Sequence, residues 1–434
     1  MLLCKIIINN NMRNYKQMNR LILALVFLIT GNLAFCAHIL IPMDNTQQNH
    51  LKAYGIAYYV LTYDVEVSWL LNYRGGSFMF PFHSEFEEEC RVRGVSYDVI
   101  ADIQAASIIE SISNPDVNKD EIVLHQLPRI AVYTPPNSLP WDDAVTLALT
   151  YAEIPYDEIY DKEVLAGVLP MYDWLHLHHE DFTGQYGKFW AAYRNAVWYQ
   201  EDVRLSEEIA RELGFETVPY LKLAVALKIQ EFVAGGGYMF AMCSAPESID
   251  IALAAKNADI VHEVFDGIPM DPNAQDKLDF TSTFAFTDFE LVTNPYEYSK
   301  SSIEVPKTGR NERTDFFTLF EFSAKWDPIP TMLTQNHETV IKGFMGQVTA
   351  FRKDYIKPTV TILGENRSKN EARYIHGVFG KGTFTFYGGH DPEDYRHFVG
   401  DPPTDLNLYP NSPGYRLILN NVLFPAARPQ KRKT

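Results

Sequence analysis

The feature that most constrains the fold is an apolar strand that runs into a sharp corner and then into a helix, within residues 232–257. A helix over residues 221–234 ends at three glycines, and the strand covers residues 238–241. Pro246 suits the first turn of the next helix. This strand–corner–helix unit is typical of α/β folds and sets the place where we look first for a functional group.

Cys243 lies at the corner, with the small residues Ala241 and Ala245 two positions away on either side. This is the pattern of a nucleophile elbow, in which a strained turn needs small neighbours so that the nucleophile can project above the sheet. A thiol at a helix N-terminus has a lowered pKa, and we therefore predict Cys243 as a nucleophile. The alternative is a buried cysteine that fills a small space in the core.

Strands and helices alternate along the chain. The order strand, proline-containing turn, helix and strand, read over residues 38–71, recurs over residues 130–160, which suggests a duplicated βαβ half. We predict an α/β fold with a doubly wound, mostly parallel sheet of the flavodoxin type. Residues 37–127 are predicted to form an N-terminal α/β unit and residues 128–427 a larger domain with insertions.

The N-terminus has the pattern of a signal peptide. Arg20 precedes an apolar run over residues 21–29 that is too short for a spanning helix. Ala34 and Cys36 are small residues at the positions that favour cleavage before Ala37, so residues 1–36 are predicted to be removed.

This signal predicts an exported protein, periplasmic or secreted. Met18 is a more usual signal-peptide start than Met1, so residues 1–17 could lie outside the translated chain. A lipoprotein is less favoured, because Phe35 is bulky where a lipidation signal needs a small residue.

The charge balance excludes some partners. The 434 residues carry a net charge of −17, and the signal segment contains four basic residues and no acid. We therefore expect neither nucleic acid nor an anionic membrane surface as a partner. The basic tail at residues 428–434 is interpreted as a frayed terminus. Only Cys90 and Cys243 remain after cleavage, which excludes a disulfide framework but leaves a single bridge open.

Histidines follow a second strand, residues 174–177. His178, His179 and Glu180 lie where parallel strands of such a sheet place ligands. With His176 and Asp181 they make three histidines and two acids within six residues, which could hold zinc or another divalent metal. His178 and His179 reach one ion only if a turn lies between them, since adjacent strand residues point to opposite faces. The alternatives are a polar loop held by hydrogen bonds, or a loop that offers backbone N–H groups to an oxyanion near Cys243.

A second candidate group follows the strand at residues 383–387. Gly388 and Gly389 allow the backbone to place His390 close to another group, and Asp391 and Glu393 come next. A helix over residues 414–423 closes the domain. The chain contains no Walker loop and no dinucleotide-binding fingerprint, so its motifs give no support to ATP-dependent chemistry.

These residues carry a family likeness. The elbow around Cys243 resembles that of the class I glutamine amidotransferase-like superfamily, and residues 380–426 resemble the end of its trehalose-utilisation (ThuA-like) branch. Almost the whole chain beyond the signal is similar to an exported family of Bacteroidetes labelled asparagine synthetase B. The stretches that carry this likeness are residues 38–44, 72–77, 175–185 and 388–405.

The resemblance implies thiol-dependent amide hydrolysis or transfer, with Cys243 as nucleophile and His390 as its base, oriented by Glu393. The spacing departs from the class I pattern, because two residues rather than one separate His390 from Glu393. The residues predicted to bind the substrate, a small-molecule amide, are His178, His179, Glu180, Ser244, Gly389 and Asp391. The alternative is a non-catalytic or carbohydrate-binding ThuA-like protein that uses His178 and His179 with aromatic residues at the strand ends.

Overall fold

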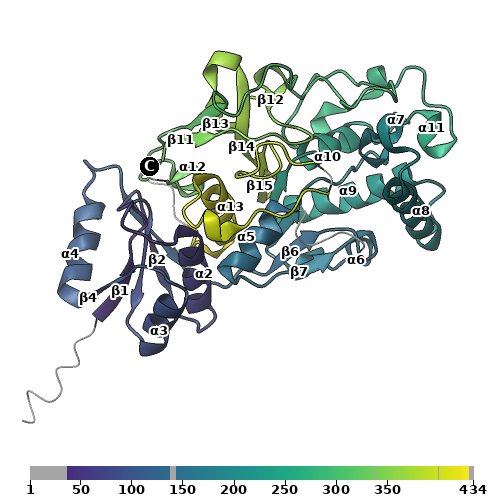
Figure 1. The fold of residues 1–434 in the computed structure, drawn as a ribbon. Helices are drawn as coiled ribbons and strands as arrows, with labels where there is room; N and C mark the ends of the chain where they lie inside the picture. The colour runs from purple at the N-terminus through teal and green to yellow at the C-terminus, as the bar shows by residue number, and fades with distance from the viewer. Residues whose placement is uncertain (1–36, 137–142, 337, 399, 430–434) are drawn as a thin grey trace, which may run out of the picture.

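The computed structural model describes residues 37–136, 143–336, 338–398 and 400–429, which form two sheets with helices packed around them (Figure 1). The predicted signal peptide and most of the predicted basic tail lie outside these residues. No helix within them has the length and apolar character needed to cross a membrane.

The N-terminal unit contains a five-stranded antiparallel sheet with the strand order β4-β1-β3-β2-β5. Its strands are β1 (Ala37–Ile41), β2 (Val67–Leu71), β3 (Ser77–Pro81), β4 (Asp98–Ala101) and β5 (Asp120–Leu124). Its helices are α2 (His50–Leu61), α3 (Ser84–Val92) and α4 (Asp102–Ser113).

The larger unit contains a ten-stranded mixed sheet, ordered β11-β10-β13-β14-β15-β9-β8-β6-β7, with β12 paired to β14. The strands from β7 to β15 in this order are parallel, and the pairs beyond β15 are antiparallel. The strands are β6 (Ile130–Tyr133), β7 (Asp157–Ile159), β8 (Trp174–Leu177), β9 (Tyr238–Met242), β10 (Phe316–Leu319), β11 (Val340–Lys342), β12 (Phe351–Arg352), β13 (Thr361–Asn366), β14 (Glu371–Phe379) and β15 (Gly382–Tyr387).

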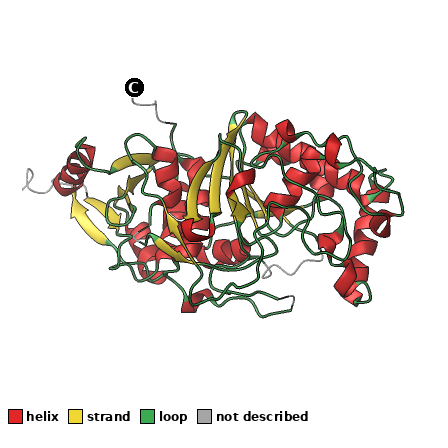
Figure 2. Ribbon diagram, turned by 90° about the horizontal axis from the view of Figure 1, so that it is seen from above, coloured by secondary structure: helices red, strands yellow, loops and turns green. Residues whose placement is uncertain are grey.

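The helices of the larger unit lie on both sides of this sheet (Figure 2). They are α5 (Ala144–Ala152), α6 (Asp161–Leu165), α7 (Trp190–Tyr193), α8 (Val197–Glu212), α9 (Val218–Gly235), α10 (Ala245–Ala254), α11 (Glu263–Asp266), α12 (Pro328–Thr334) and α13 (Pro413–Leu423). Alternate strand residues enter two cores: Val132 and Trp174 pack with α5 and α13, whereas Ala131 and Leu175 pack with α9 and α10. Helix α2 packs against α5 and α13, so the N-terminal unit shares the first of these cores.

The prediction of a doubly wound, mostly parallel flavodoxin-type sheet is wrong. One sheet is wholly antiparallel and the other is mixed. The duplicated βαβ half is wrong as well, because β1 is antiparallel to both of its neighbours, whereas β6 is parallel to both of its own. The connection between β2 and the unpredicted β3 reverses the chain in a few residues, with Asn72 and Arg74 in the left-handed region, and such a tight reversal produces an antiparallel pair.

Three strands of the mixed sheet end side by side. Leu177 of β8 is paired with Ala241 of β9, and Met242 of β9 with Tyr387 of β15. The residues that follow these strands therefore meet at one edge of the sheet, and they are the histidine pair His178 and His179, the elbow cysteine, and the glycine pair that precedes His390.

Candidate functional site: a histidine cluster beside a cysteine elbow

The corner after β9 has the predicted conformation. Cys243 has a φ of 52°, in the left-handed region that a non-glycine residue occupies only at a cost of about 1–3 kcal/mol. Helix α10 begins two residues later, and the flanking Ala241 and Ala245 are both fully buried. Such strain is typical of functional turns.

The sulfur of Cys243 lies in a closed environment. The side chain is buried, and its Sγ accepts the backbone N–H of Gln347 at 3.2 Å. Burial raises the pKa of the Cys243 thiol to about 11, and the nearby N–H donors and Lys307 only partly oppose this effect. The direction is opposite to the one predicted from the helix N-terminus alone. Cys243 and Cys90 are both free thiols, so the bridge left open by the sequence is not formed.

His390 lies beside the elbow. The carbonyl of Gly389 accepts the backbone N–H of Cys243 at 3.0 Å. Gly389 has a φ of 106°, and a Cβ at this position would lie 2.4 Å from the Phe344 ring, so the site requires glycine. The prediction that glycines let the backbone place His390 close to another group is therefore confirmed.

The sequence predicted that Glu393 would orient the ring of His390, but Nδ1 of His390 contacts His178 instead. This atom lies 2.9 Å from Nε2 of His178, whereas the side chain of Glu393 forms a hydrogen bond with Ser412. Burial raises the pKa of the Glu393 carboxyl. The positioning partner of His390 shown by this geometry is thus His178.

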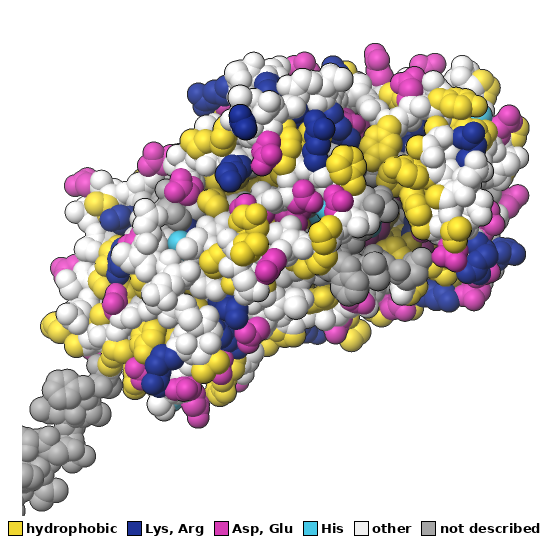
Figure 3. Space-filling model, in the orientation of Figure 1, with side chains coloured by type: hydrophobic (Ala, Val, Ile, Leu, Met, Phe, Trp, Pro, Cys, Tyr) yellow, Lys and Arg dark blue, Asp and Glu magenta, His cyan; other side chains and the backbone are white. Residues whose placement is uncertain are grey.

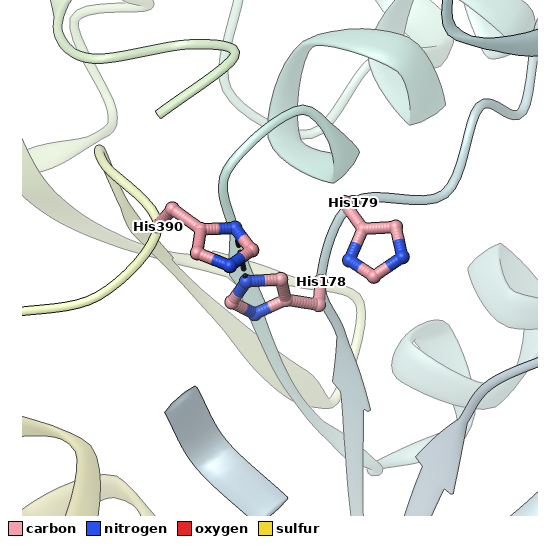
Figure 4. A group of neighbouring side chains, drawn as sticks. All are labelled: His178, His179 and His390. Atoms are coloured by element: carbon pink, nitrogen blue, oxygen red, sulfur yellow. Dashed lines mark hydrogen bonds between the residues drawn. The ribbon is translucent and has the colours of Figure 1, made fainter. Parts of the chain in front are cut away.

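Three histidine rings converge at this edge of the sheet. His178 and His179 come from the loop after β8, and His390 approaches from the loop after β15 (Figure 4). One nitrogen of each ring lies within 4.8 Å of the others, which makes the three a possible metal-binding group. Strand β8 ends at Leu177, so the turn needed to bring both neighbouring rings to one place is present.

Asp143 supports this group from behind. It is the N-cap of α5, accepting the backbone N–H groups of Val145 and Thr146. Its carboxylate lies 3.0 Å from Nε2 of His176 and 3.4 Å from Nδ1 of His178. Burial acts to raise the pKa of Asp143, but its electrostatic interactions with His176 and His178 and its hydrogen bond with His176 outweigh this effect and hold the pKa below its usual range.

Asp143 was not predicted from the sequence, because it looks like an ordinary helix cap. His176 entered the prediction as one of the three histidines within residues 176–181, with no separate role. The alternation of β8 places it on the same side of the strand as His178.

The remaining predicted substrate-binding residues hold the backbone of the site. Ser244 donates from Oγ to the carbonyl of His179 at 2.8 Å. Glu180 accepts the backbone N–H of His178 at 2.9 Å, and burial raises its pKa. Asp391 accepts the backbone N–H of Glu393 at 2.8 Å. Their role in binding substrate stays a prediction.

A fifth histidine extends the cluster toward the surface. The ring of His397 stacks on that of His390, with centroids 4.3 Å apart and planes inclined by 17°, and its Nδ1 lies 3.1 Å from Asp394. Asp394, His397 and Asp401 form a further possible metal-binding group. Histidine and acidic side chains come to the surface together near the middle of the face drawn in Figure 3.

Comparisons with known proteins name no family. No family model and no curated protein match the chain. Two cytoplasmic proteins from Salmonella typhimurium align over 70% and 69% of this chain and 100% of each of theirs, at 9% identity, with TM-scores of 0.34 and 0.33. An exo-β-1,4-mannosidase from Opitutaceae bacterium strain TAV5 aligns over 60% of this chain and 31% of its own, with 11% identity and a TM-score of 0.28. Similarities this low carry no argument about the chain.

Proposed function

We propose that the chain is a metal-dependent hydrolase in which His178, His179 and His390 hold a divalent ion, zinc in the first place. The proposed substrate is a small polar molecule with a hydrolysable amide bond, in keeping with the sequence resemblance. The observation that carries the proposal is the convergence of three imidazole nitrogens within 4.8 Å at the ends of neighbouring strands.

The protonation state of the rings favours a metal. A histidine must be neutral to bind an ion. Burial lowers the pKa of His178 to about 3, although the Asp143 carboxylate acts in the opposite direction. The ring is therefore neutral at physiological pH, and a neutral imidazole has one ring nitrogen with a lone pair for a cation.

The surroundings of the rings also fit. Metal-bound histidines usually present their second nitrogen to a carboxylate or carbonyl, which fixes the ring and raises its basicity. Asp143 lies 3.4 Å from Nδ1 of His178, close to this arrangement, although the two atoms form no hydrogen bond. In addition, Nδ1 of His179 is buried and has no hydrogen-bond partner among the described residues. An unsatisfied buried nitrogen is costly, and a ligand that binds it would remove that cost.

The number of ligands favours catalysis over a structural role. Structural zinc sites are closed by four protein ligands, whereas catalytic sites use three and leave one position for water. The described residues provide three. A bound zinc would supply a water activated near neutral pH. The neighbouring protein groups would orient the rings through Asp143 and exclude bulk solvent, since His178 is fully buried.

Metal analysis of the untagged protein tests this proposal. We expect about one zinc per chain after equilibration with the ion, and less than about one tenth in His179→Ala and His390→Ala, because each removes one of three ligands. His125→Ala is the matched control, since this histidine is exposed and lies outside the cluster. Equal zinc content in all four proteins, or none in the wild type, would refute the proposal.

A second function is favoured by the left-handed corner at Cys243. The strained φ and the N–H of Gln347 on Sγ are what a thiol nucleophile at an elbow would show. In this alternative Cys243 attacks an amide carbonyl and His390 is its base. His390 is then positioned through His178 and Asp143, because these residues and not Glu393 are aligned behind its Nδ1.

Alkylation by iodoacetamide at neutral pH separates the two functions. The thiol mechanism predicts that Cys243 reacts much faster than Cys90, whose buried thiol has its pKa raised to about 12, and that His178→Gln slows the reaction more than Glu393→Gln. The metal mechanism predicts an unreactive Cys243, in agreement with its buried thiol and raised pKa.

A further inference from the structure

A surface pocket opens beside the histidine cluster. Its volume is about 520 Å³, and it is lined by Arg310, Asn311, Glu312, Glu393, Asp394, Tyr395 and Arg396. The pocket is connected to the site through its own lining. Asp394 pairs with His397, which stacks on His390, and Met345 links the two backbones by donating to the Tyr395 carbonyl and accepting from the N–H of His390.

Arg310 is the buried floor of this pocket. The residue is only 7% exposed. Its Nη1 and Nη2 donate to the two oxygens of Glu371 at 3.0 Å and 2.7 Å, and Nη1 also lies 3.4 Å from Asp315. Its Nε, however, is buried without a hydrogen-bond partner among the described residues. A buried charged donor without a hydrogen-bond partner is energetically costly. The Nε atom of Arg310 is therefore the first indication that a ligand binds here.

Tyr395 and Arg396 add two more uncommitted donors. The hydroxyl of Tyr395 is also buried without a partner. Burial and Asp315 raise the pKa of Tyr395, while Arg310, Arg373 and Arg396 are close enough for their charges to oppose this. Arg396 is exposed, and its guanidinium forms no hydrogen bond or ion pair with any described residue.

The acidic groups of the pocket are mostly engaged elsewhere. Glu393 bonds to Ser412, and Asp394 accepts from His397 and from the N–H of Arg396. Only Glu312, on the exposed loop, is uncommitted among them. Among the pocket groups without a hydrogen-bond partner in the described part of the chain, the donors of Arg310, Tyr395 and Arg396 therefore outnumber the acceptors, which belong to Glu312.

The buried network below the pocket is balanced in charge. Arg373 binds Asp315 through two contacts of 2.8 Å and 2.7 Å, and Arg310 binds Glu371. Lys369, which lies 3.2 Å from Asp315, is exposed. The group that an anion would satisfy is therefore the unpaired Nε of Arg310 and not a surplus of charge.

We propose that this pocket binds an oxyanion, a carboxylate, phosphate or sulfate group, through Arg310 Nε, the Tyr395 hydroxyl and the Arg396 guanidinium. Guanidinium and hydroxyl donors suit the oxygens of such groups, and a charge-assisted hydrogen bond is about twice as strong as a neutral one. If the proposed function holds, the bound anion is one end of the hydrolase substrate, and this inference rests on that function. The resulting substrate is a small anionic molecule whose charged end lies in this pocket while its reactive bond reaches the histidines.

Calorimetric titration of the metal-free protein with inorganic phosphate, sulfate and acetate, at ionic strength held constant with sodium chloride, tests the proposal. We expect saturable one-site binding of at least one anion. Tyr395→Phe and Arg396→Gln should each weaken it by about tenfold, because each removes one donor to a charged group. Arg313→Gln is the matched control, an exposed arginine a few residues from Arg310 along the chain and outside the pocket lining, and it should leave the affinity unchanged.

The three anions distinguish the chemistry, since preference for acetate indicates a carboxylate and preference for phosphate or sulfate indicates a tetrahedral anion. Equal affinity in all variants, or no saturable binding, would overturn the proposal. His179→Ala should bind the anion as well as the wild type does. A chain that binds the anion but no metal would refute the proposed function and leave the oxyanion site intact.

Discussion

The N-terminal unit and the larger unit of this protein differ in how many charged side chains they bury. In the described part of the N-terminal unit, the buried polar residues are Gln47, His50 and Ser77, and the guanidinium of Arg93, whose side chain is 8% exposed, pairs with Glu89 and Glu153 at the surface. The larger unit buries charged side chains repeatedly, including Asp143, Glu247, Asp250, Lys222 and Arg373. Burying charge is energetically costly, so the contrast makes the larger unit the first place to test for chemistry.

The sharpest way to test this contrast is to damage the small sheet. Trp69 of β2 is fully buried and packs on Phe78. Trp69→Ala should reduce the free energy of unfolding by about 3–5 kcal/mol, because the truncation leaves a large cavity. Denaturant titration measures this loss. Zinc affinity, measured on the folded protein at low temperature, should stay within about twofold of the wild type; a large loss of affinity would show that the two units are coupled.

A substitution of Asp143 in the larger unit is expected to lower the zinc affinity, which the Trp69 substitution should leave unchanged. Asp143→Asn keeps a side chain that can cap α5 but removes the charge behind His178. Zinc affinity should fall by about 10–100-fold, as for other partners that orient metal ligands. Competition with a chromophoric chelator measures it. An unchanged affinity would mean that Asp143 is only a helix cap.

A pH-dependent effect is expected at His376, a buried histidine of β14 outside the cluster. Burial lowers its pKa to about 4, so the folded protein binds fewer protons there than the unfolded chain between pH 4 and about 6.5. Stability contributed by this group is therefore lost as pH falls through that range. His376→Gln should flatten the pH dependence there by about 3 kcal/mol, which corresponds to the lowered pKa.

Unfolding measured at several pH values in both proteins gives the difference directly. Comparison of the two is needed because burial raises the pKa of Glu247 to about 7 and of Asp250 to about 6, which gives the opposite slope. Parallel curves for the two proteins would show that His376 has the same pKa in the folded and unfolded states, and would contradict the lowered pKa.

The sequence predicts individual elements of this protein better than their pairing. The strand at residues 174–177 and the helix near the C-terminus were correctly predicted, because apolar periodicity reports local structure. The partner of a strand is not part of that signal, so β1 was assigned to a parallel sheet although its neighbours are antiparallel. Helix α4 was not predicted, although Ala105, Ile108, Ile109 and Ile112 follow the helical spacing and form its packed face.

The site was partly predictable for the same reason. Small neighbours and a helix start predicted the corner at Cys243, and a local feature such as a left-handed turn follows from local residues. The pairing of His390 with His178 joins positions 212 residues apart, and only the parallel alignment of β8, β9 and β15 brings them together. Glu393 was assigned to His390 by nearness in sequence, but the fold directs it to Ser412.

The most direct test of the account is X-ray absorption at the zinc edge of the zinc-loaded protein. The account predicts a first shell of three imidazole nitrogens at about 2.0–2.1 Å completed by oxygen, with one imidazole contribution lost in His179→Ala. A sulfur at about 2.3 Å would place Cys243 on the metal, and a shell without imidazole would place the ion elsewhere. Either result would contradict a three-histidine centre.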